Sequence, residues 1–236
     1  MENIIGYIKF IEEDYIDSFF LLEKLWLSEI SAFIESSEEL VDDLINDPNE
    51  GRLDSIFLNM PSYITSFTEL TKNSFDDNGV LKKTISDSII KSEEKLGKNR
   101  KFIFIPNQNM QHLLNDLNNA QHGELEGVLS HTNIFSRKVC YIADYKNEMR
   151  KLEDDFFAGN ASIDSIAKGL LQTKDEKYKI QNEFRLGIVL PYKKNEFTYR
   201  DEPGVELKLE PVISFATLCF KREELKTINI NQLHSK

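Results

Sequence analysis

Several motifs that mark common enzyme families are missing from this chain of 236 residues. It contains no G-x-x-x-x-G-K-[ST] loop and no G-x-G-x-x-G turn, which excludes the ordinary phosphate-loop and dinucleotide-binding sites. It also lacks the G-x-S-x-G elbow that presents the nucleophilic serine of many hydrolases. Ten glycines and six prolines are scattered along the chain and mark no long linker.

Cysteine is scarce, with two residues in the whole chain, Cys140 and Cys219. That number is too small for a disulfide scaffold. Both lie in apolar, strand-like runs, so we expect two buried, reduced thiols. Cys140 in particular lies between Val139 and Tyr141, a position that favours a structural thiol over a nucleophile.

Long hydrophobic runs are absent as well. The longest ones, FIFIP and VISFATLCF, have the length of strands, whereas a membrane helix needs about 20 apolar residues. The opening residues MENIIGYIKFIEEDY carry acids where a secretory signal has a basic start. We therefore expect no membrane association and a cytoplasmic location.

No metal site is indicated by the spacing of potential ligands. His112, His122 and His131 are ten and nine residues apart and have no paired cysteines near them. The acidic residues between Ser36 and Asp54 do not follow the pattern of a calcium loop. A solvated acidic loop is the preferred interpretation of that segment.

Acidic residues outnumber basic residues, and the net charge is −11 with a pI of about 5.0. A broad nucleic-acid-binding surface is therefore disfavoured. One local basic cluster remains, formed by Lys95, Lys98, Arg100 and Lys101. It leaves a nucleic-acid-processing protein as a third hypothesis, with a solvated loop as the preferred interpretation of the cluster.

The aromatic content, 16 Phe and eight Tyr, supplies the material of a folded core. The short apolar run KFIFIP at residues 101–106 predicts a buried strand, and helices are predicted at residues 146–159, ending at Gly159, and at residues 162–173, with Ser162 as the N-cap. The chain shows no internal repeat. We predict a single α+β domain over residues 1–236, with a mixed, mostly antiparallel sheet and helices inserted between strands.

The most informative stretch is KYKIQNEFRLGIVL, residues 177–190. Its alternation predicts a strand with one apolar face, and the other face aligns Gln181, Glu183 and Arg185. Such a polar row is costly to bury, so it needs partners or a function. Two interpretations remain open. Glu183 and Arg185 pair with neighbouring strands on a solvated sheet face, or the three side chains line a cleft.

A carboxylate in a cleft can stabilise an oxocarbenium-like sugar cation by holding a ribosyl hydroxyl while the bond to a leaving base breaks. Glu183 is the candidate catalytic carboxylate, and the Gln181 amide is placed to orient an acceptor nucleophile. Polar residues of the first two predicted strands, Tyr7, Lys9 and Ser28, complete the set of candidate site residues.

Two features resemble known families. The Q-x-E sequence Gln181-Asn182-Glu183 resembles the catalytic strand of ADP-ribosyltransferases. The order of short motifs is similar to that of bacterial and phage-borne proteins of the DUF2971 and AbiGi-type families. These motifs are Tyr7-Ile8-Lys9-Phe10, Leu25 to Ser28, Asp47 to Gly51, and Lys174 to Arg185.

The first resemblance implies an NAD-dependent ADP-ribosyltransferase-like toxin or phage-defence effector with a macromolecular acceptor, protein or nucleic acid. Glu183 would contact the nicotinamide ribose, and Gln181 would meet the acceptor. Tyr7, Lys9 and Ser28 would contact NAD. In this chain Lys9 or Tyr7 stands where arginine-first transferases carry an arginine, and Ser28 alone stands for their Ser-Thr-Ser strand.

The alternative is a non-catalytic interaction protein of a phage defence or counter-defence system, bound by an antitoxin or another defence-system partner. In that case Glu183 and Arg185 form a structural ion pair. The acidic segment from Glu35 to Glu50 would then be the surface that docks the partner.

Overall fold

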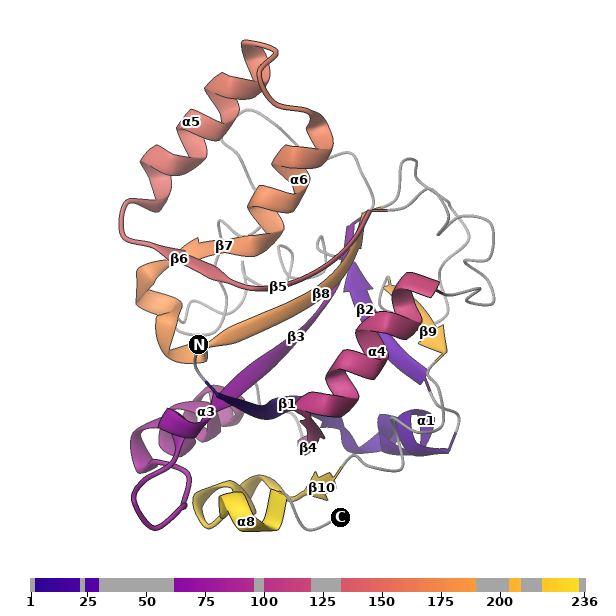
Figure 1. The fold of residues 1–236 in the computed structure, drawn as a ribbon, viewed down its shortest axis with the longest axis vertical. Helices are drawn as coiled ribbons and strands as arrows, with labels where there is room; N and C mark the ends of the chain where they lie inside the picture. Colours follow the sequence, from indigo (N-terminus) through magenta and orange to yellow (C-terminus); the bar gives the residue numbers. More distant parts are fainter. Residues whose placement is uncertain are drawn as a thin grey trace.

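A computed structural model describes residues 3–21, 24–29, 62–95, 100–119, 133–189, 204–208 and 218–233. The predicted α+β fold is confirmed: a large antiparallel sheet is combined with several helices, as Figure 1 shows. The acidic segment at residues 35–50 lies outside the described residues, as does part of the basic cluster at residues 95–101. Among the described helices, none has the length and apolar character needed to cross a membrane.

The large sheet has eight strands, and every pair in it is antiparallel. Its strands are β1 (Ile4–Glu12), β2 (Lys24–Glu29), β3 (Ser62–Thr71), β4 (Arg100–Pro106), β5 (Asn133–Lys138), β8 (Glu183–Val189), β9 (Gly204–Lys208) and β10 (Leu218–Phe220). A separate parallel pair consists of β6 (Cys140–Ile142) and β7 (Thr173–Asp175). The large sheet is therefore entirely antiparallel, and among the described strands parallel pairing is confined to the separate β6–β7 pair.

The described helices include the two that the sequence predicts, at residues 146–159 and 162–173. The α-helices are α1 (Ile16–Phe20), α3 (Lys83–Lys95), α4 (Asn107–Asn119), α5 (Tyr145–Phe157), α6 (Ile163–Gln172) and α8 (Ile230–Leu233). The short 3-10 turns are η1 (Glu13–Tyr15), η2 (Lys72–Ser74), η5 (Glu176–Gln181) and η6 (Arg222–Lys226). Ser162 caps α6 as predicted, because its hydroxyl accepts the backbone N–H of Ser165 at 3.2 Å.

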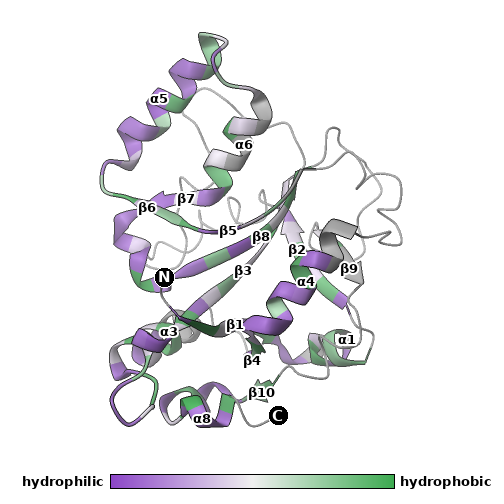
Figure 2. Ribbon diagram, viewed as in Figure 1, coloured by the Kyte–Doolittle hydropathy of each residue, from purple (hydrophilic) through white to green (hydrophobic). Residues whose placement is uncertain are grey.

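Strand β3 organises the sheet, since it pairs along one side with β8 and along the other side with both β1 and β2. The outermost strand next to β8 is β5. Two apolar clusters cover the two faces of the sheet. One face packs on α1 and α4 through Phe19, Met110 and Leu113. The other face packs on α3, η6 and α8, and Figure 2 shows hydrophobic colouring along β1 and β4 between the two layers.

The two cysteines are exposed, so the expectation that both are buried is wrong. Each lies on a strand of three residues at the margin of its sheet, β6 or β10. In β10, Leu218 and Phe220 pack against the core, and Cys219 between them points to the opposite side. An apolar run indicates a strand, but it does not say whether both faces of that strand are covered.

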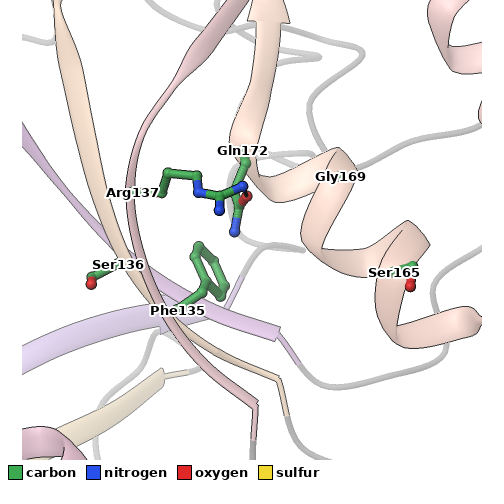
Figure 3. A pocket seen from close by; sticks show the side chains of 6 residues that line it. All are labelled: Phe135, Ser136, Arg137, Ser165, Gly169 and Gln172. Carbon is green, nitrogen blue, oxygen red and sulfur yellow. Dashed lines mark hydrogen bonds between the residues drawn. The ribbon is translucent and has the colours of Figure 1, made fainter.

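A pocket of about 420 Å³ lies between β5 and α6 (Figure 3). Its lining residues are Phe135, Ser136, Arg137, Ser165, Gly169 and Gln172. The ring of Phe135 crosses β8 at Gly187, where a side chain would collide with it: a Cβ atom on Gly187 would lie 2.1 Å from the ring. Phe135 is 7% exposed, so the ring has little room to move away.

Replacing Gly187 with alanine tests this close approach. We expect Gly187→Ala to lower the free energy of unfolding by about 1–3 kcal/mol, because the added methyl must displace a buried ring. Urea unfolding at neutral pH measures the change. The double variant Gly187→Ala/Phe135→Leu should recover part of the loss, and equal stability of wild type and Gly187→Ala would contradict the packing described.

Candidate functional site

Glu183 is placed by a sharp change in backbone direction just before β8. Residues Glu176 to Gln181 form the 3-10 turn η5, and Asn182 follows in the left-handed region with φ 42° and ψ 51°. Asparagine tolerates this conformation better than most residues. The prediction of one strand over residues 177–190 is therefore wrong for its first six residues, and Gln181 is not two strand positions before Glu183.

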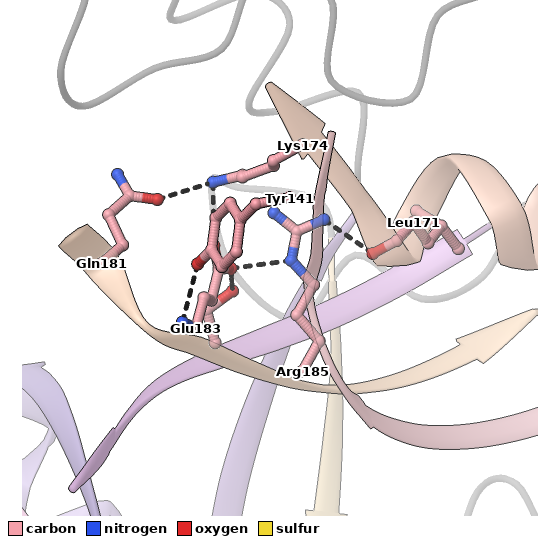
Figure 4. A network of polar contacts seen from close by, with 7 residues as sticks. Tyr141, Leu171, Lys174, Gln181, Glu183 and Arg185 are labelled. Carbon is pink, nitrogen blue, oxygen red and sulfur yellow. Dashed lines mark hydrogen bonds and ion pairs between the residues drawn. The ribbon is translucent and has the colours of Figure 1, made fainter. Parts of the chain in front are cut away.

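The Glu183 carboxylate is enclosed by donors from the chain itself (Figure 4). Its Oε1 accepts the Arg185 Nε–H at 2.7 Å and the hydroxyl of Ser66. Its Oε2 lies 2.9 Å from the Lys174 ammonium in an ion pair, and among the described residues it accepts no hydrogen bond. Glu183 is 6% exposed, so these contacts replace water almost completely.

Arg185 joins β8 to the end of a helix. Its guanidinium is fully buried, and Nη1 donates a hydrogen bond to the backbone oxygen of Leu171 at 2.7 Å. Leu171 lies in the last turn of α6, where carbonyl groups have no partner within the helix and the helix dipole is negative. The predicted Glu183–Arg185 ion pair is present, but it lies in the protein interior and not on a solvated face.

Lys174 brings Gln181 and Glu183 together. Its ammonium donates to Gln181 Oε1 at 3.1 Å and also pairs with Glu183, and the residue is 4% exposed. From β6, the Tyr141 hydroxyl accepts the backbone N–H of Glu183 at 2.8 Å. The cluster of Glu183, Arg185, Lys174, Gln181, Ser66 and Tyr141, here called the Glu183 cluster, therefore joins β3, β6, β7 and η5 to β8.

The charge environment keeps Glu183 ionised. Burial acts to raise the pKa of this carboxyl, but the nearby positive charges of Arg185 and Lys174 act in the opposite direction and outweigh it. The pKa of Glu183 is therefore held well below its usual value of 4.5. A carboxylate that is ionised at neutral pH and surrounded by cations is suited to holding those cations in place.

Tyr7 and Lys9 lie on the opposite face of the sheet from Glu183. Tyr7 pairs with Glu69 of β3, whereas Glu183 pairs with the adjacent residue Thr68, and neighbouring residues of a strand point to opposite faces. Lys9, two residues after Tyr7, shares its face. These two candidate NAD contacts therefore do not converge with Glu183.

The contacts of Tyr7 and Lys9 are with the core of their own face. The ring of Tyr7 packs 4.9 Å from that of Phe184, and burial together with the charge of Glu69 raises the pKa of Tyr7 to about 12. The Lys9 ammonium lies 5.5 Å from the ring centroid of Phe67. Tyr7 is thus a neutral core residue at physiological pH.

Ser28 shares the face of Glu183 but lies far along the sheet from it. It pairs with Ile64 of β3, four residues before Thr68, which pairs with Glu183. Four strand residues span roughly 13 Å, and β3 lies between the two side chains. Of the predicted site residues, the structure brings Gln181 and Glu183 together and leaves the other three apart.

Three members of the cluster were not predicted as site residues: Lys174, Ser66 and Tyr141. The hydroxyl residues of the β3 sequence SYITSFTEL are a signal for Ser66, because they interrupt an otherwise apolar strand. Lys174 and Tyr141 belong to strands of three residues, whose sequence carries no periodicity to interpret. Within the described residues, no group of three or more His, Cys, Asp or Glu is arranged to hold a metal ion.

No family model, curated protein or solved structure matches this chain.

Removing the negative charge of the cluster should cost stability. We expect Glu183→Gln to lower the free energy of unfolding by about 3–5 kcal/mol, because Arg185 and Lys174 would remain buried without their anion. Urea unfolding followed by circular dichroism measures the loss. The matched control is Glu176→Gln, which removes an exposed pair with Lys179 and should leave the midpoint nearly unchanged.

The lowered pKa of Glu183 predicts how the free energy of unfolding depends on pH. Its pKa is lowered in the folded chain, so the stabilisation is complete above the unfolded value of 4.5 and is lost as pH falls toward the folded pKa. We expect the stability difference between wild type and Glu183→Gln to be constant from about pH 8 to 5.5. Below about pH 4.5 it should shrink by up to about 1.4 kcal/mol per pH unit. A difference that already shrinks between pH 8 and 6 would contradict the lowered pKa.

Proposed function

We propose that this chain acts by binding a macromolecular partner as a non-catalytic interaction protein, and that Glu183 stabilises the fold. The observation that carries the proposal is the enclosure of the Glu183 carboxylate, which is 6% exposed and contacts Arg185, Lys174 and Ser66. A catalytic carboxylate acts on charge that develops on a substrate beside it. Here both carboxylate oxygens are already occupied by side chains of the chain itself.

The position of the other candidate residues supports the same proposal. A nucleotide bound at Glu183 would have to reach Tyr7 and Lys9 through the sheet, since both lie on the opposite face. Tyr7 is also 2% exposed. The resemblance to bacterial and phage-borne families suggests the setting of the partner, a defence or counter-defence system.

NAD-dependent ADP-ribosyl transfer remains the competing hypothesis, and the two differ in what they predict for Glu183 and Gln181. The transferase hypothesis requires that the Glu183 cluster opens to admit a ribose. It predicts that Gln181→Ala and Glu183→Gln lose transfer while each remains folded. The interaction proposal predicts no transfer by any form of the chain and the same captured partner for wild type and Gln181→Ala.

The deciding experiment uses the tagged chain in bacterial extract, with and without phage infection, in the presence of labelled NAD. We expect no label transfer above the level of extract alone. We also expect a complex of defined stoichiometry in size-exclusion chromatography with light scattering. Circular dichroism of each variant separates loss of function from loss of folding. Transfer by wild type that a folded Glu183→Gln variant lacks would overturn the proposal in favour of the transferase.

A further inference from the structure

Strand β5 forms an exposed edge of the sheet. β5 pairs with β8, and in the part of the chain that the structure describes no strand lies along its other side. Ser136, Arg137 and Lys138 are all exposed there. A strand edge of this kind is a template on which an extended peptide can add a further strand.

The hydrogen-bond pattern shows which residues face outward. The N–H of Val139 donates to the backbone oxygen of Glu183 at 2.8 Å, so Val139 faces β8. In an antiparallel pair, inward and outward backbone groups alternate along the strand. Arg137 therefore also directs its backbone to β8, and Ser136 and Lys138 direct their N–H and C=O groups to the open side.

The pocket between β5 and α6 opens beside this edge. Phe135 and Arg137 point toward α6, whereas the side chain of Ser136 points away from them (Figure 3). Ser136 nevertheless lines the pocket, which indicates that the pocket reaches its backbone at the open side of β5. With a volume of about 420 Å³, the pocket has room for a side chain of an added strand.

The charges around the pocket favour one kind of side chain from an added strand. Among the described residues, the Arg137 guanidinium makes a long, weak hydrogen bond to the neutral Gln172 amide oxygen, at 3.5 Å. Arg137 also lies opposite Arg185 in the β5–β8 register, so two cations are adjacent. The Ser165 hydroxyl lines the same pocket. A carboxylate would supply the anion that Arg137 lacks and could accept a paired hydrogen bond from its guanidinium.

Other occupants fit the charges less well. A second copy of β5 would bring the exposed cations Arg137 and Lys138 of two chains close together, and like charges across a strand pair are destabilising. A nucleic acid or an anionic membrane could meet the cation with a phosphate, but neither has a peptide backbone that can pair with the edge of β5. An extended acidic segment of a protein satisfies both the open backbone groups and the cation.

We propose that the outer edge of β5 pairs with an extended, acidic segment of a protein partner, which places a carboxylate in the pocket at Arg137. This inference rests on the proposed function and names the surface through which the partner is bound. The outward backbone N–H and C=O of Ser136 provide the strand pairing, and Arg137 provides the preference for acidic side chains.

Three fluorescent eight-residue peptides test the acidic preference, with threonine alternating with glutamate, glutamine or lysine. We expect the glutamate peptide to bind the wild-type chain about tenfold more tightly than the glutamine peptide, and the lysine peptide to bind least. Arg137→Gln should remove the difference between the first two. Equal binding of the glutamate and glutamine peptides, or no binding of the glutamate peptide up to about 1 mM, would overturn the proposal.

Ser136→Pro tests the strand pairing. Proline is tolerated on an edge strand where the N–H faces outward, but it removes that donor and obstructs an added strand. We expect Ser136→Pro to abolish peptide binding, and the matched variant Ser136→Ala, which keeps the N–H, to bind as wild type. If Ser136→Pro does not fold, Arg137→Gln and the glutamine peptide still decide the proposal.

Hydrogen exchange adds a measurement on the unmodified protein. The amide of Ser136 should exchange rapidly in the free chain and slow down when the glutamate peptide is bound. The inward amide of Arg137 should be protected in both states and serves as the internal control. Slow exchange at Ser136 in the free chain would show that the edge is already covered and would overturn the proposal.

Two further outcomes separate this inference from the proposed function. If Ser136→Pro still captures the wild-type partner from extract, the β5 edge is not the docking surface although the interaction function stands. If wild type captures no partner, the proposed function itself fails. Dimerisation in sedimentation experiments that Ser136→Pro abolishes would replace the acidic partner with a second copy of the chain.

Discussion

Arg185 imposes the strongest constraint on this fold, because its guanidinium is completely buried and a buried cation must be paired. Glu183 on the same strand supplies the charge, and Leu171 at the end of α6 supplies a carbonyl oxygen. The hydrogen bond from Arg185 therefore ties α6 to β8, and α5 packs on α6. Lys174 extends the constraint to β7.

This arrangement explains why a row of polar residues can lie within an apolar sheet. The charges of Glu183, Arg185 and Lys174 compensate one another, so the cost of burying them is offset by close ion pairs and by the hydrogen bonds at Glu183 Oε1. The same contacts leave the carboxylate little exposed to a substrate. The opposite face of the sheet is filled by an aromatic core that includes Tyr7, Phe67 and Phe184, so the predicted cofactor contacts Tyr7 and Lys9 lie across the sheet from the carboxylate.

Strand β5, which pairs with the outer side of β8, differs from β8 in burial. All seven residues of β8 are buried, whereas Ser136, Arg137 and Lys138 of β5 are exposed. The cation at Arg137 lies beside a pocket, and its counterpart Arg185 across the strand pair has an anion within the fold. The contrast between a paired and a poorly paired arginine on adjacent strands makes the β5 edge the best-supported docking surface of the described chain.

The sequence by itself determined the α+β class, the strand at residues 101–106 and helices α5 and α6, because the strand is a short, wholly apolar run and the helices have clear end signals at Gly159 and Ser162. It also identified Glu183 and Arg185 as an ion pair. It failed at residues 177–181, where Tyr178 and Ile180 alternate like a strand but form a 3-10 turn that ends at the left-handed Asn182.

Only the tertiary structure decided which residues share a face. Strand register places Tyr7 opposite Glu69 and Glu183 opposite Thr68, and that difference of one residue on β3 separates the predicted site residues. The partners Lys174 and Tyr141 come from short strands without a readable pattern, and they reach Glu183 through the packing of one layer on another. Periodicity along one strand carries no information about the register between strands, which is set by the packing of the whole sheet.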